Sequence, residues 1–219
     1  MARAAGLPVA VAALALLAGC GGGGGGSAQT DGRTASPATA HPGAAGACPV
    51  TGKKVSFPRL DPRKHYVVSA RTNLGMFAFS LDTKDSPCTT ASFAALVRRK
   101  FFDGIRFHRI VPGFVIQGGD PSGTGTGGPG YTVVDTPPPT ARYTRGVVAM
   151  AKTGADPAGT SGSQFFVVTA ADAGLPPEYA LLGKVTRGLA VVERIGKLGN
   201  PTTEHPTRRV VIRSMTISP

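Results

Sequence analysis

The pattern of apolar and polar positions divides the chain into three regions. Residues 7–18 form an apolar run, residues 21–46 offer almost nothing to bury, and short apolar runs alternate with polar turns from Tyr66 onward. Short apolar runs bounded by Gly and Pro predict strands, whereas apolar positions at helical intervals predict helices. The sequence therefore predicts one folded domain, preceded by two segments without a core of their own.

The folded region opens with a predicted β-hairpin. Residues 66–70 and 75–81 are rich in aromatic and β-branched side chains, and the residues between them favour a turn. Five further apolar runs of strand length follow, at residues 105–116, 146–151, 165–169, 179–185 and 209–217. Their spacing is typical of an all-β barrel or sandwich.

Two helices are predicted among these strands. The first begins at Ser86, whose hydroxyl we expect to cap it, and continues with Pro87, whose missing N–H costs nothing in a first turn. We expect this helix to end near Asp103 and Gly104. The second covers residues 189–197, where apolar residues recur at helical intervals.

The first twenty residues resemble a bacterial lipoprotein signal. Arg3 supplies a positive start, residues 7–18 are apolar, and residues 17–20 read Leu-Ala-Gly-Cys. The run is shorter than the roughly 20 apolar residues of a spanning helix, which favours a cleaved export signal over a transmembrane anchor. In proteins with this pattern the cysteine becomes the mature N-terminus and carries lipid. We therefore expect Cys20 to be lipidated and the protein to be anchored to the bacterial cell membrane, outside the cytoplasm. A plain secretory signal that ends at a cysteine is the alternative.

These features set the expected domain boundaries. We assign residues 1–19 to the signal peptide, residues 20–60 to a Gly/Ala/Pro-rich tether and N-terminal extension, and residues 61–219 to the folded domain. An exported protein meets an oxidising environment, so Cys48 and Cys88 are plausible disulfide partners. Such a bridge would clip the extension onto the domain; two unrelated thiols are the alternative.

The chain is strongly basic, with 24 Lys and Arg against 12 Asp and Glu and a net charge of +12. A balance of this size fits attraction to nucleic acid, anionic lipid or cell-wall polymers, and equally a generic soluble surface. The four histidines have no cysteine or acidic companions at metal-ligand spacing, so we expect no metal site.

Residues 107–120 carry the most specific motif, Phe-His-Arg-Ile-Val-Pro-Gly-Phe-Val-Ile-Gln-Gly-Gly-Asp. Residues 146–151 (Gly-Val-Val-Ala-Met-Ala) and 161–169 (Ser-Gly-Ser-Gln-Phe-Phe-Val-Val-Thr) follow it in order. Together these blocks closely resemble the core signature of the cyclophilin family, over roughly residues 65–217. The resemblance implies a mainly β fold, a closed eight-stranded antiparallel barrel capped by two α-helices, in agreement with the strands and helices predicted above.

The resemblance implies a peptidyl-prolyl cis/trans isomerase that assists the folding of exported proteins and needs no cofactor. Rotation about an X–Pro bond faces a barrier of about 18–20 kcal/mol from amide resonance, and no covalent bond breaks. An enzyme lowers it by holding the ring and stabilising a pyramidal prolyl nitrogen. By resemblance, Arg109 is that stabilising group, because its guanidinium stays charged and offers several N–H donors. Phe114 and Gln117 complete the implied catalytic set.

The resemblance also implies a set of substrate-binding residues. Phe166 with Val115 and Leu175 would join Phe114 in holding the proline ring, and Gln164 would join Gln117 in bonding the substrate backbone or orienting the arginine. The residue before proline would lie along a rim of main chain. The full set is Val115, Ala151, Lys152, Gln164, Phe166, Leu175 and Tyr179.

Three positions depart from the family pattern. Lys152 stands where many relatives have Asn, which puts side-chain contacts there in doubt, and Tyr179 stands where many have His. Gly174 falls where many eukaryotic relatives carry a Trp that contacts cyclosporin, so we expect weak cyclosporin binding. The expected partners are proline-containing unfolded or flexible polypeptides and, through the lipid, the membrane; we expect no nucleic-acid partner and a monomer. The alternative function is a non-catalytic proline-peptide-binding or chaperone module, and a basic adhesin is a third.

Overall fold

The structure, a computed structural model, describes residues 47–219. The predicted signal peptide, the lipidation site Cys20 and most of the predicted tether lie outside the described residues. Within residues 47–219, no helix is long and apolar enough to cross a membrane.

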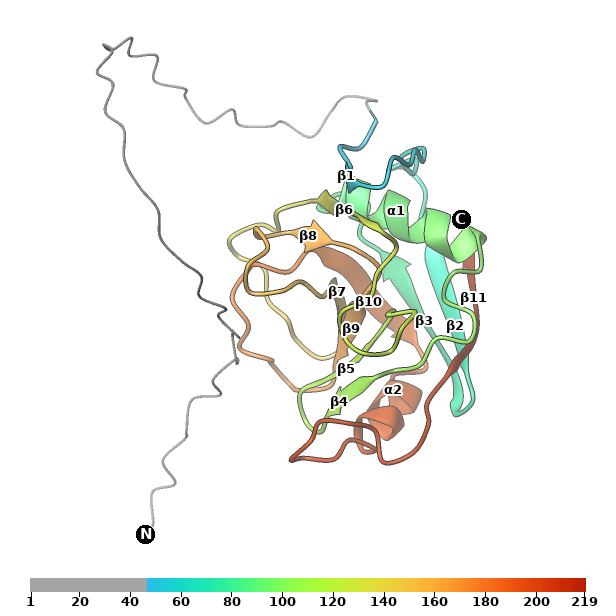
Figure 1. Ribbon diagram of the computed structural model, residues 1–219, viewed down its shortest axis with the longest axis vertical. Helices are drawn as coiled ribbons and strands as arrows, with labels where there is room; N and C mark the ends of the chain where they lie inside the picture. Colours follow the sequence, from blue (N-terminus) through green and yellow to red (C-terminus); the bar gives the residue numbers. More distant parts are fainter. Residues whose placement is uncertain (1–46) are drawn as a thin grey trace, which may run out of the picture. The chain divides into compact units, whose positions relative to one another are not determined.

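The described residues form two α-helices and a set of mostly short strands (Figure 1). The helices are α1 (Pro87–Arg98) and α2 (Leu189–Gly196). The strands are β1 (Thr51–Gly52), β2 (Val67–Thr72), β3 (Gly75–Leu81), β4 (Arg109–Val111), β5 (Val115–Gly118), β6 (Tyr131–Val134), β7 (Val147–Met150), β8 (Thr160–Ser161), β9 (Phe165–Val168), β10 (Leu181–Arg187) and β11 (Ile212–Ser218).

Eight of these strands form one curled antiparallel sheet in the order β11-β2-β3-β10-β7-β9-β5-β4. The predicted hairpin is confirmed as β2 and β3, which pair from Val67 to Leu81 in regular register. Figure 1 shows α1 and α2 at opposite ends of the curled sheet. Strands β1, β6 and β8 form a second, three-stranded sheet beside α1.

The predicted closed barrel is wrong, because the eight-stranded sheet is open between β4 and β11. The chain before β4 approaches β11 only briefly: the Phe107 N–H donates to the Val210 carbonyl, and Arg106 and Val211 form an isolated bridge. The next residue, His108, already donates to the Gln117 carbonyl in β5. The chain thus changes partner within one residue, which leaves a half-barrel.

Helix α1 begins at Pro87 as predicted, but its capping group and its end differ from the prediction. The Ser86 hydroxyl makes no hydrogen bond to the helix; instead an Asp135 carboxylate oxygen accepts the Thr89 N–H at 2.5 Å. The helix ends at Arg98 rather than near Gly104, because Lys100 adopts a left-handed conformation with φ 56°. The Phe101 N–H then reaches back to the Leu96 carbonyl at 3.0 Å, which is the hydrogen bond that ends many helices, usually with glycine in the Lys100 position.

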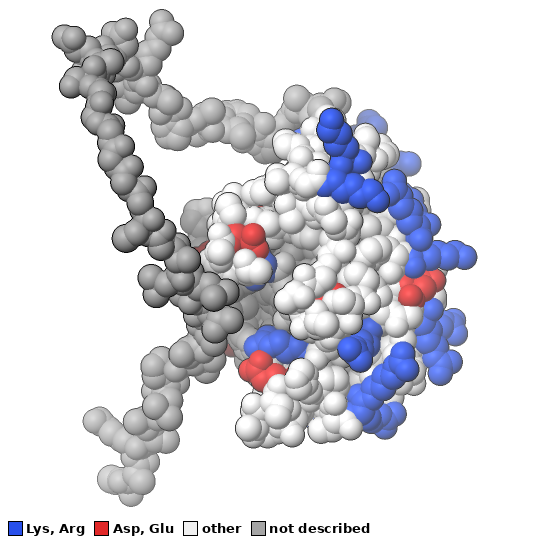
Figure 2. Space-filling model, viewed as in Figure 1, with Lys and Arg blue, Asp and Glu red and all other residues white. Residues whose placement is uncertain are grey.

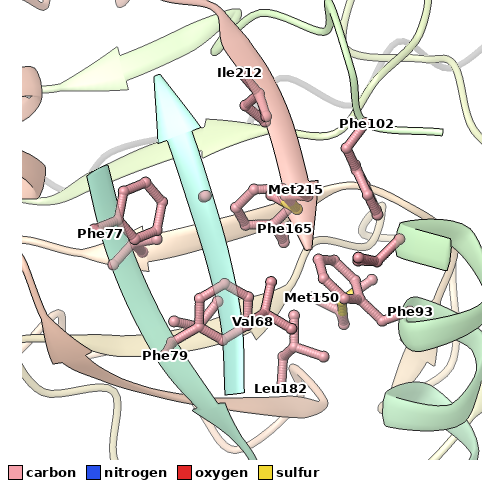
Figure 3. Packing of buried hydrophobic residues seen from close by; sticks show 14 of the residues in the cluster. Val68, Phe77, Phe79, Phe93, Phe102, Met150, Phe165, Leu182, Ile212 and Met215 are labelled. Atoms are coloured by element: carbon pink, nitrogen blue, oxygen red, sulfur yellow. The ribbon is translucent and has the colours of Figure 1, made fainter. Parts of the chain in front are cut away.

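Strand alternation gives the sheet two apolar faces. The inner face of β5 and β9 carries Ile116, Phe165 and Val167, which join the main core between the sheet and α1 (Figure 3). In that core Phe93 of α1 meets the Phe165 ring edge-on, with centroids 5.6 Å apart. The outer face carries Val115 and other residues that belong to a separate cluster. The second cluster marks the face that bears the candidate site.

The N-terminal extension, residues 47–60, packs against the domain. Cys48 and Cys88 of α1 form a disulfide with their Cα atoms 5.4 Å apart. Phe57 is buried beside Tyr131 of β6, with ring centroids 6.0 Å apart, and the short strand β1 pairs with β6. The extension is therefore fixed by a covalent bond, a ring contact and backbone hydrogen bonds.

Candidate active site

A row of residues crosses four neighbouring strands on the outer face of the sheet. Arg109 in β4 lies opposite Gln117 in β5, Gln117 lies opposite Phe166 in β9, and Phe166 lies opposite Ala149 in β7. Residues directly opposite one another in antiparallel strands have side chains on the same face, about 4.5–5.5 Å apart at Cβ. The sheet register thus brings a cation, an amide and an aromatic ring together.

Hydrogen bonds extend from this row on both sides. The Arg109 Nε donates to a Glu204 carboxylate oxygen at 2.6 Å, and its Nη1 donates to the Gln117 Oε1 at 3.4 Å. The Gln117 Nε2 donates in turn to the Gln164 Oε1 at 3.0 Å. Gln164 then donates to the carbonyls of Gly125 and Gly127 at 2.8 and 2.9 Å. A continuous network therefore orients the guanidinium.

The Gly-rich loop that accepts from Gln164 is built around Asp120. This carboxylate is buried and accepts hydrogen bonds from the N–H groups of Ser122 and Gly125 and from the Ser122 hydroxyl, at 2.6–2.7 Å. Burial alone would raise the pKa of Asp120, but the hydrogen bonds from Ser122, Gly125 and Gly127 outweigh it and hold the pKa far below its ordinary value. The loop is thus tied to an ionised side chain.

An apolar cluster borders the network. Val115 and Phe166 are almost fully buried in it, and Phe114, Leu175 and Tyr179 lie partly exposed at its surface. The Phe166 and Tyr179 rings meet edge-on with centroids 5.6 Å apart. A partly exposed apolar surface beside the Arg109 guanidinium suits a ligand in which a small aliphatic ring is joined to a polar amide group.

Tyr143 positions Tyr179 within this cluster. Its hydroxyl donates to the Tyr179 carbonyl at 2.6 Å and accepts the Tyr179 N–H at 3.0 Å. Burial raises the pKa of Tyr143 to about 12, so the hydroxyl stays protonated and able to donate.

The side chain of Lys152 is occupied by protein groups. Its Nζ lies 3.1 Å from a Glu178 carboxylate oxygen, donates to the Thr153 and Asp156 carbonyls, and lies 5.6 Å from the centre of the Tyr179 ring. The side chain is only 4% exposed. Lys152 therefore braces the loops beside the cluster, and its charge is already paired with Glu178.

A hollow of about 550 Å³ lies beside the hydrogen-bond network and shares Gln117 and Gln164 with it. Gln117, Ala151 and Gln164 line one side of it, and the Gly-rich loop lines another. Thr51 and Gly52 of the extension also line it. Its size falls within the range of about 300–1,000 Å³ that is typical of ligand sites.

All ten residues singled out as catalytic or substrate-binding from the sequence lie in this region. Arg109, Gln117 and Gln164 share one network, Lys152 contacts Tyr179, and the remaining apolar residues belong to one cluster. The sequence reasoning missed Glu204, which lies 95 residues from its partner, and the wall contributed by the extension. No sequence motif marks either feature.

Comparison with known proteins gives one family. The profile of the cyclophilin type peptidyl-prolyl cis-trans isomerase/CLD family matches residues 67–217. Peptidyl-prolyl cis-trans isomerase-like 1 of Homo sapiens is 38% identical over 149 residues, which cover 66% of this chain and 88% of the relative. Peptidyl-prolyl cis-trans isomerase B of Bacillus subtilis is 46% identical over 112 residues, 51% of this chain and 76% of the relative.

Solved structures show the same likeness. A cyclophilin type peptidyl-prolyl cis-trans isomerase of Cryptosporidium parvum superposes with a TM-score of 0.64 at 29% identity, over 71% of this chain and 99% of that one. A second structure of that protein, determined in the presence of the dipeptide Ala-Pro, gives a TM-score of 0.63 at 29% identity, over 70% of this chain and 99% of that one.

Proposed function

The chain belongs to the cyclophilin-type peptidyl-prolyl cis-trans isomerases, and from this membership we propose that it isomerises X–Pro bonds of exported polypeptides from a lipid anchor outside the cytoplasm. It is a peptidyl-prolyl cis-trans isomerase. The setting rests on the lipoprotein-like residues 17–20 and on Cys48 and Cys88, which suit an oxidising compartment. The substrates are then unfolded or flexible segments that meet a monomeric enzyme on its tether.

The single observation that carries the proposed mechanism is the cross-strand row of Arg109, Gln117 and Phe166. In this mechanism the proline ring rests on Phe166 beside Phe114 and Val115. Glu204 and Gln117 hold the Nε and Nη1 of Arg109, and no hydrogen bond within residues 47–219 engages its Nη2. The Nη2 group then donates to the prolyl nitrogen as that nitrogen becomes pyramidal.

This interaction lowers the barrier because it exists only in the twisted state. In the planar ground state the nitrogen lone pair is delocalised into the carbonyl and accepts no hydrogen bond; in the transition state it is free. A donor fixed before the reaction acts on that charge without reorganisation. The Phe166 wall contributes differently, because it holds the ring still while the preceding chain turns.

The test is the cis-to-trans isomerisation of an Ala-Pro peptide by the purified chain. We expect acceleration by the wild type, and a loss in kcat/KM of about 10²–10³ in Arg109→Ala, the size seen when one fixed donor to a transition state is removed. Arg98→Ala, which removes an exposed arginine at the end of α1, serves as the matched control and should keep full activity. Equal losses in both variants, or an active Arg109→Ala, would contradict the role of Arg109.

A further inference from the structure

We propose that the disulfide-clipped extension is part of the substrate site, and that Lys53 gives this site a preference for an acidic side chain just upstream of the X–Pro pair. This inference rests on the proposed isomerase function and assigns its upstream specificity.

The extension forms one wall of the 550 Å³ hollow through Thr51 and Gly52. These two residues pair with Thr132 and Tyr131 of β6, and the Lys53 N–H donates to the Gly130 carbonyl at 2.8 Å. The contact is close: a Cβ atom added at Gly52, whose φ is +96°, would lie 2.7 Å from the Gly130 oxygen. Only glycine lets this wall approach β6 at this distance.

The wall is held firmly enough to select among ligands. Cys48 is bonded to Cys88, and both lie in a buried cluster with Phe57 and Tyr131. Arg59 supplies a favourable charge beside the half-buried carboxylate of Asp135, whose pKa is raised by partial burial despite that charge. The extension is thus attached on both sides of residues 51–53, which form the wall.

The hollow lies on the upstream side of the bound proline. By family resemblance, the residue before proline lies along the main chain of Ala151 and Lys152, away from the ring-holding cluster. Ala151 and Lys152 also line the hollow, together with Gln117 and Gln164. A peptide that places its proline against Phe166 therefore leads its preceding residues into the space that the extension encloses.

The charged residues that line the hollow are engaged by other protein groups, whereas Lys53, the cation of the extension wall, is exposed next to the lining residue Gly130. Lys152 is paired with Glu178, and the Asp156 carboxylate, which stays ionised near Lys152, accepts the N–H and hydroxyl of Thr153 at 2.9 and 2.7 Å. Lys53 is exposed and forms no ion pair within residues 47–219. Its side chain runs beside Gly130, because a Cβ atom added there would lie 3.8 Å from the Lys53 Cβ.

Figure 2 shows that most Lys and Arg side chains on the viewed face gather along the edge formed by α1, β2 and β11. Lys53 differs from that group because its backbone N–H donates a hydrogen bond to the carbonyl of Gly130, a residue that lines the hollow. A positive group beside Gly130 attracts a carboxylate and repels an ammonium group. The favoured ligand is therefore a Glu or Asp that precedes X in the segment X–Pro.

The experiment compares kcat/KM for Glu-Ala-Pro, Lys-Ala-Pro and minimal Ala-Pro peptides with the full chain. We expect the wild type to favour the Glu peptide over the Lys peptide about twofold to fivefold, the range of one exposed ion pair, and less at high salt. Lys53→Glu should reverse the preference. Lys100→Glu, the same charge change after the end of α1, should leave it unaltered.

A second variant tests the wall independently of the charge. Cys48→Ser with Cys88→Ser removes the clip, and we expect it to lose the preference between peptides while it retains the wild-type rate on the Ala-Pro peptide. An unchanged Glu preference in Lys53→Glu would overturn the inference. No acceleration of Ala-Pro isomerisation by the wild type would instead contradict the isomerase function. Failure of the inference and failure of the proposed function therefore give different results.

Discussion

Arg109 is held by groups that come from distant parts of the chain. Gln117 lies in the same motif and opposite Arg109 in the sheet, so the motif itself predicts their proximity. Glu204 lies in a turn after α2 and adopts a left-handed conformation with φ 58°, an unusual state for a non-glycine residue. Because the Ile110 N–H donates to the Glu204 carbonyl at 2.8 Å, the backbone fixes the carboxylate beside the guanidinium.

We expect Glu204 to act through Arg109. Glu204→Ala frees the Arg109 Nε, and a misplaced guanidinium should lower kcat/KM about threefold to tenfold, well below the roughly hundredfold cost of a 1 Å displacement in a catalytic group. Glu204→Gln keeps an acceptor for the Nε and should recover most of the activity. Peptide isomerisation at saturating and low substrate should place the loss in kcat rather than in KM.

Stability provides the control for Glu204. The Arg109 and Glu204 side chains are 35% and 37% exposed, so their ion pair contributes about 0–1 kcal/mol to folding. Both Glu204 variants should therefore unfold in urea at nearly the wild-type midpoint. A large stability loss together with the activity loss would contradict a positioning role.

At the scale of elements, alternation along the strands determines which face becomes the site. In β5, Ile116 lies in the main core, whereas Val115 and Gln117 lie on the outer face. A run that is apolar at successive positions predicts a strand buried on both faces. It does not predict that polar residues of a binding site lie on the outer face of the sheet. That information came from the family motif, not from periodicity.

The Gly-rich loop lines the hollow, and its fixed conformation depends on Asp120. Asp120→Asn removes a charged acceptor from the N–H groups of Ser122 and Gly125, which should cost about 1–3 kcal/mol of unfolding free energy. The loop carbonyls that bind Gln164 then lose their fixed positions. We expect a lower kcat/KM for Ala-Pro peptides and a lower urea midpoint, whereas the exposed change Asp85→Asn should alter neither.

The pH dependence gives a second measurement for Asp120. Its pKa in the folded state lies below the ordinary value of 3.8, so its stabilising contribution is present above pH 3.8 and is lost as pH falls below that value. Urea unfolding at about pH 7 and about pH 3 should show a smaller acid destabilisation in Asp120→Asn than in the wild type. An identical loss in both proteins would contradict this assignment.

Helix α1 shows why boundaries were harder to predict than elements. Ser86 and Pro87 correctly marked the start, but the cap came from Asp135, which follows β6 in the sequence and meets the helix only in the folded chain. The end was mistaken because Lys100 occupies a conformation that usually requires glycine. Local residue preferences do not report partners supplied by tertiary structure.

At the scale of the whole molecule, the open sheet and the extension follow from contacts that no local pattern encodes. The eight antiparallel strands were implied by the family resemblance, but closure depended on whether residues 104–107 stay beside β11, and His108 turns away to β5. The extension has few apolar residues, yet Cys48, Phe57 and the pairing of β1 with β6 attach it to the domain. Residues 51–52 of the extension therefore line the hollow.

The net charge of +12 offers a second route to the membrane besides lipid. A basic surface attracts anionic lipid by about 1 kcal/mol per charge close to the surface, and salt weakens the attraction. A lipid chain contributes about 0.8 kcal/mol per buried methylene, which salt does not weaken. The two routes therefore differ in their response to a high-salt wash.

We expect Cys20→Ser to move the protein from the membrane fraction to the soluble fraction after such a wash, because it removes the acceptor of the proposed lipid. Its specific activity on Ala-Pro peptides should equal that of the wild type, since Cys20 is not a residue of the candidate active site and precedes Cys48 by a long Gly-rich stretch of sequence. Cys48→Ser, which leaves the lipid site intact, should remain with the membrane. Retention of Cys20→Ser at high salt would refute the lipid anchor; release of both proteins by salt alone would assign attachment to the basic surface.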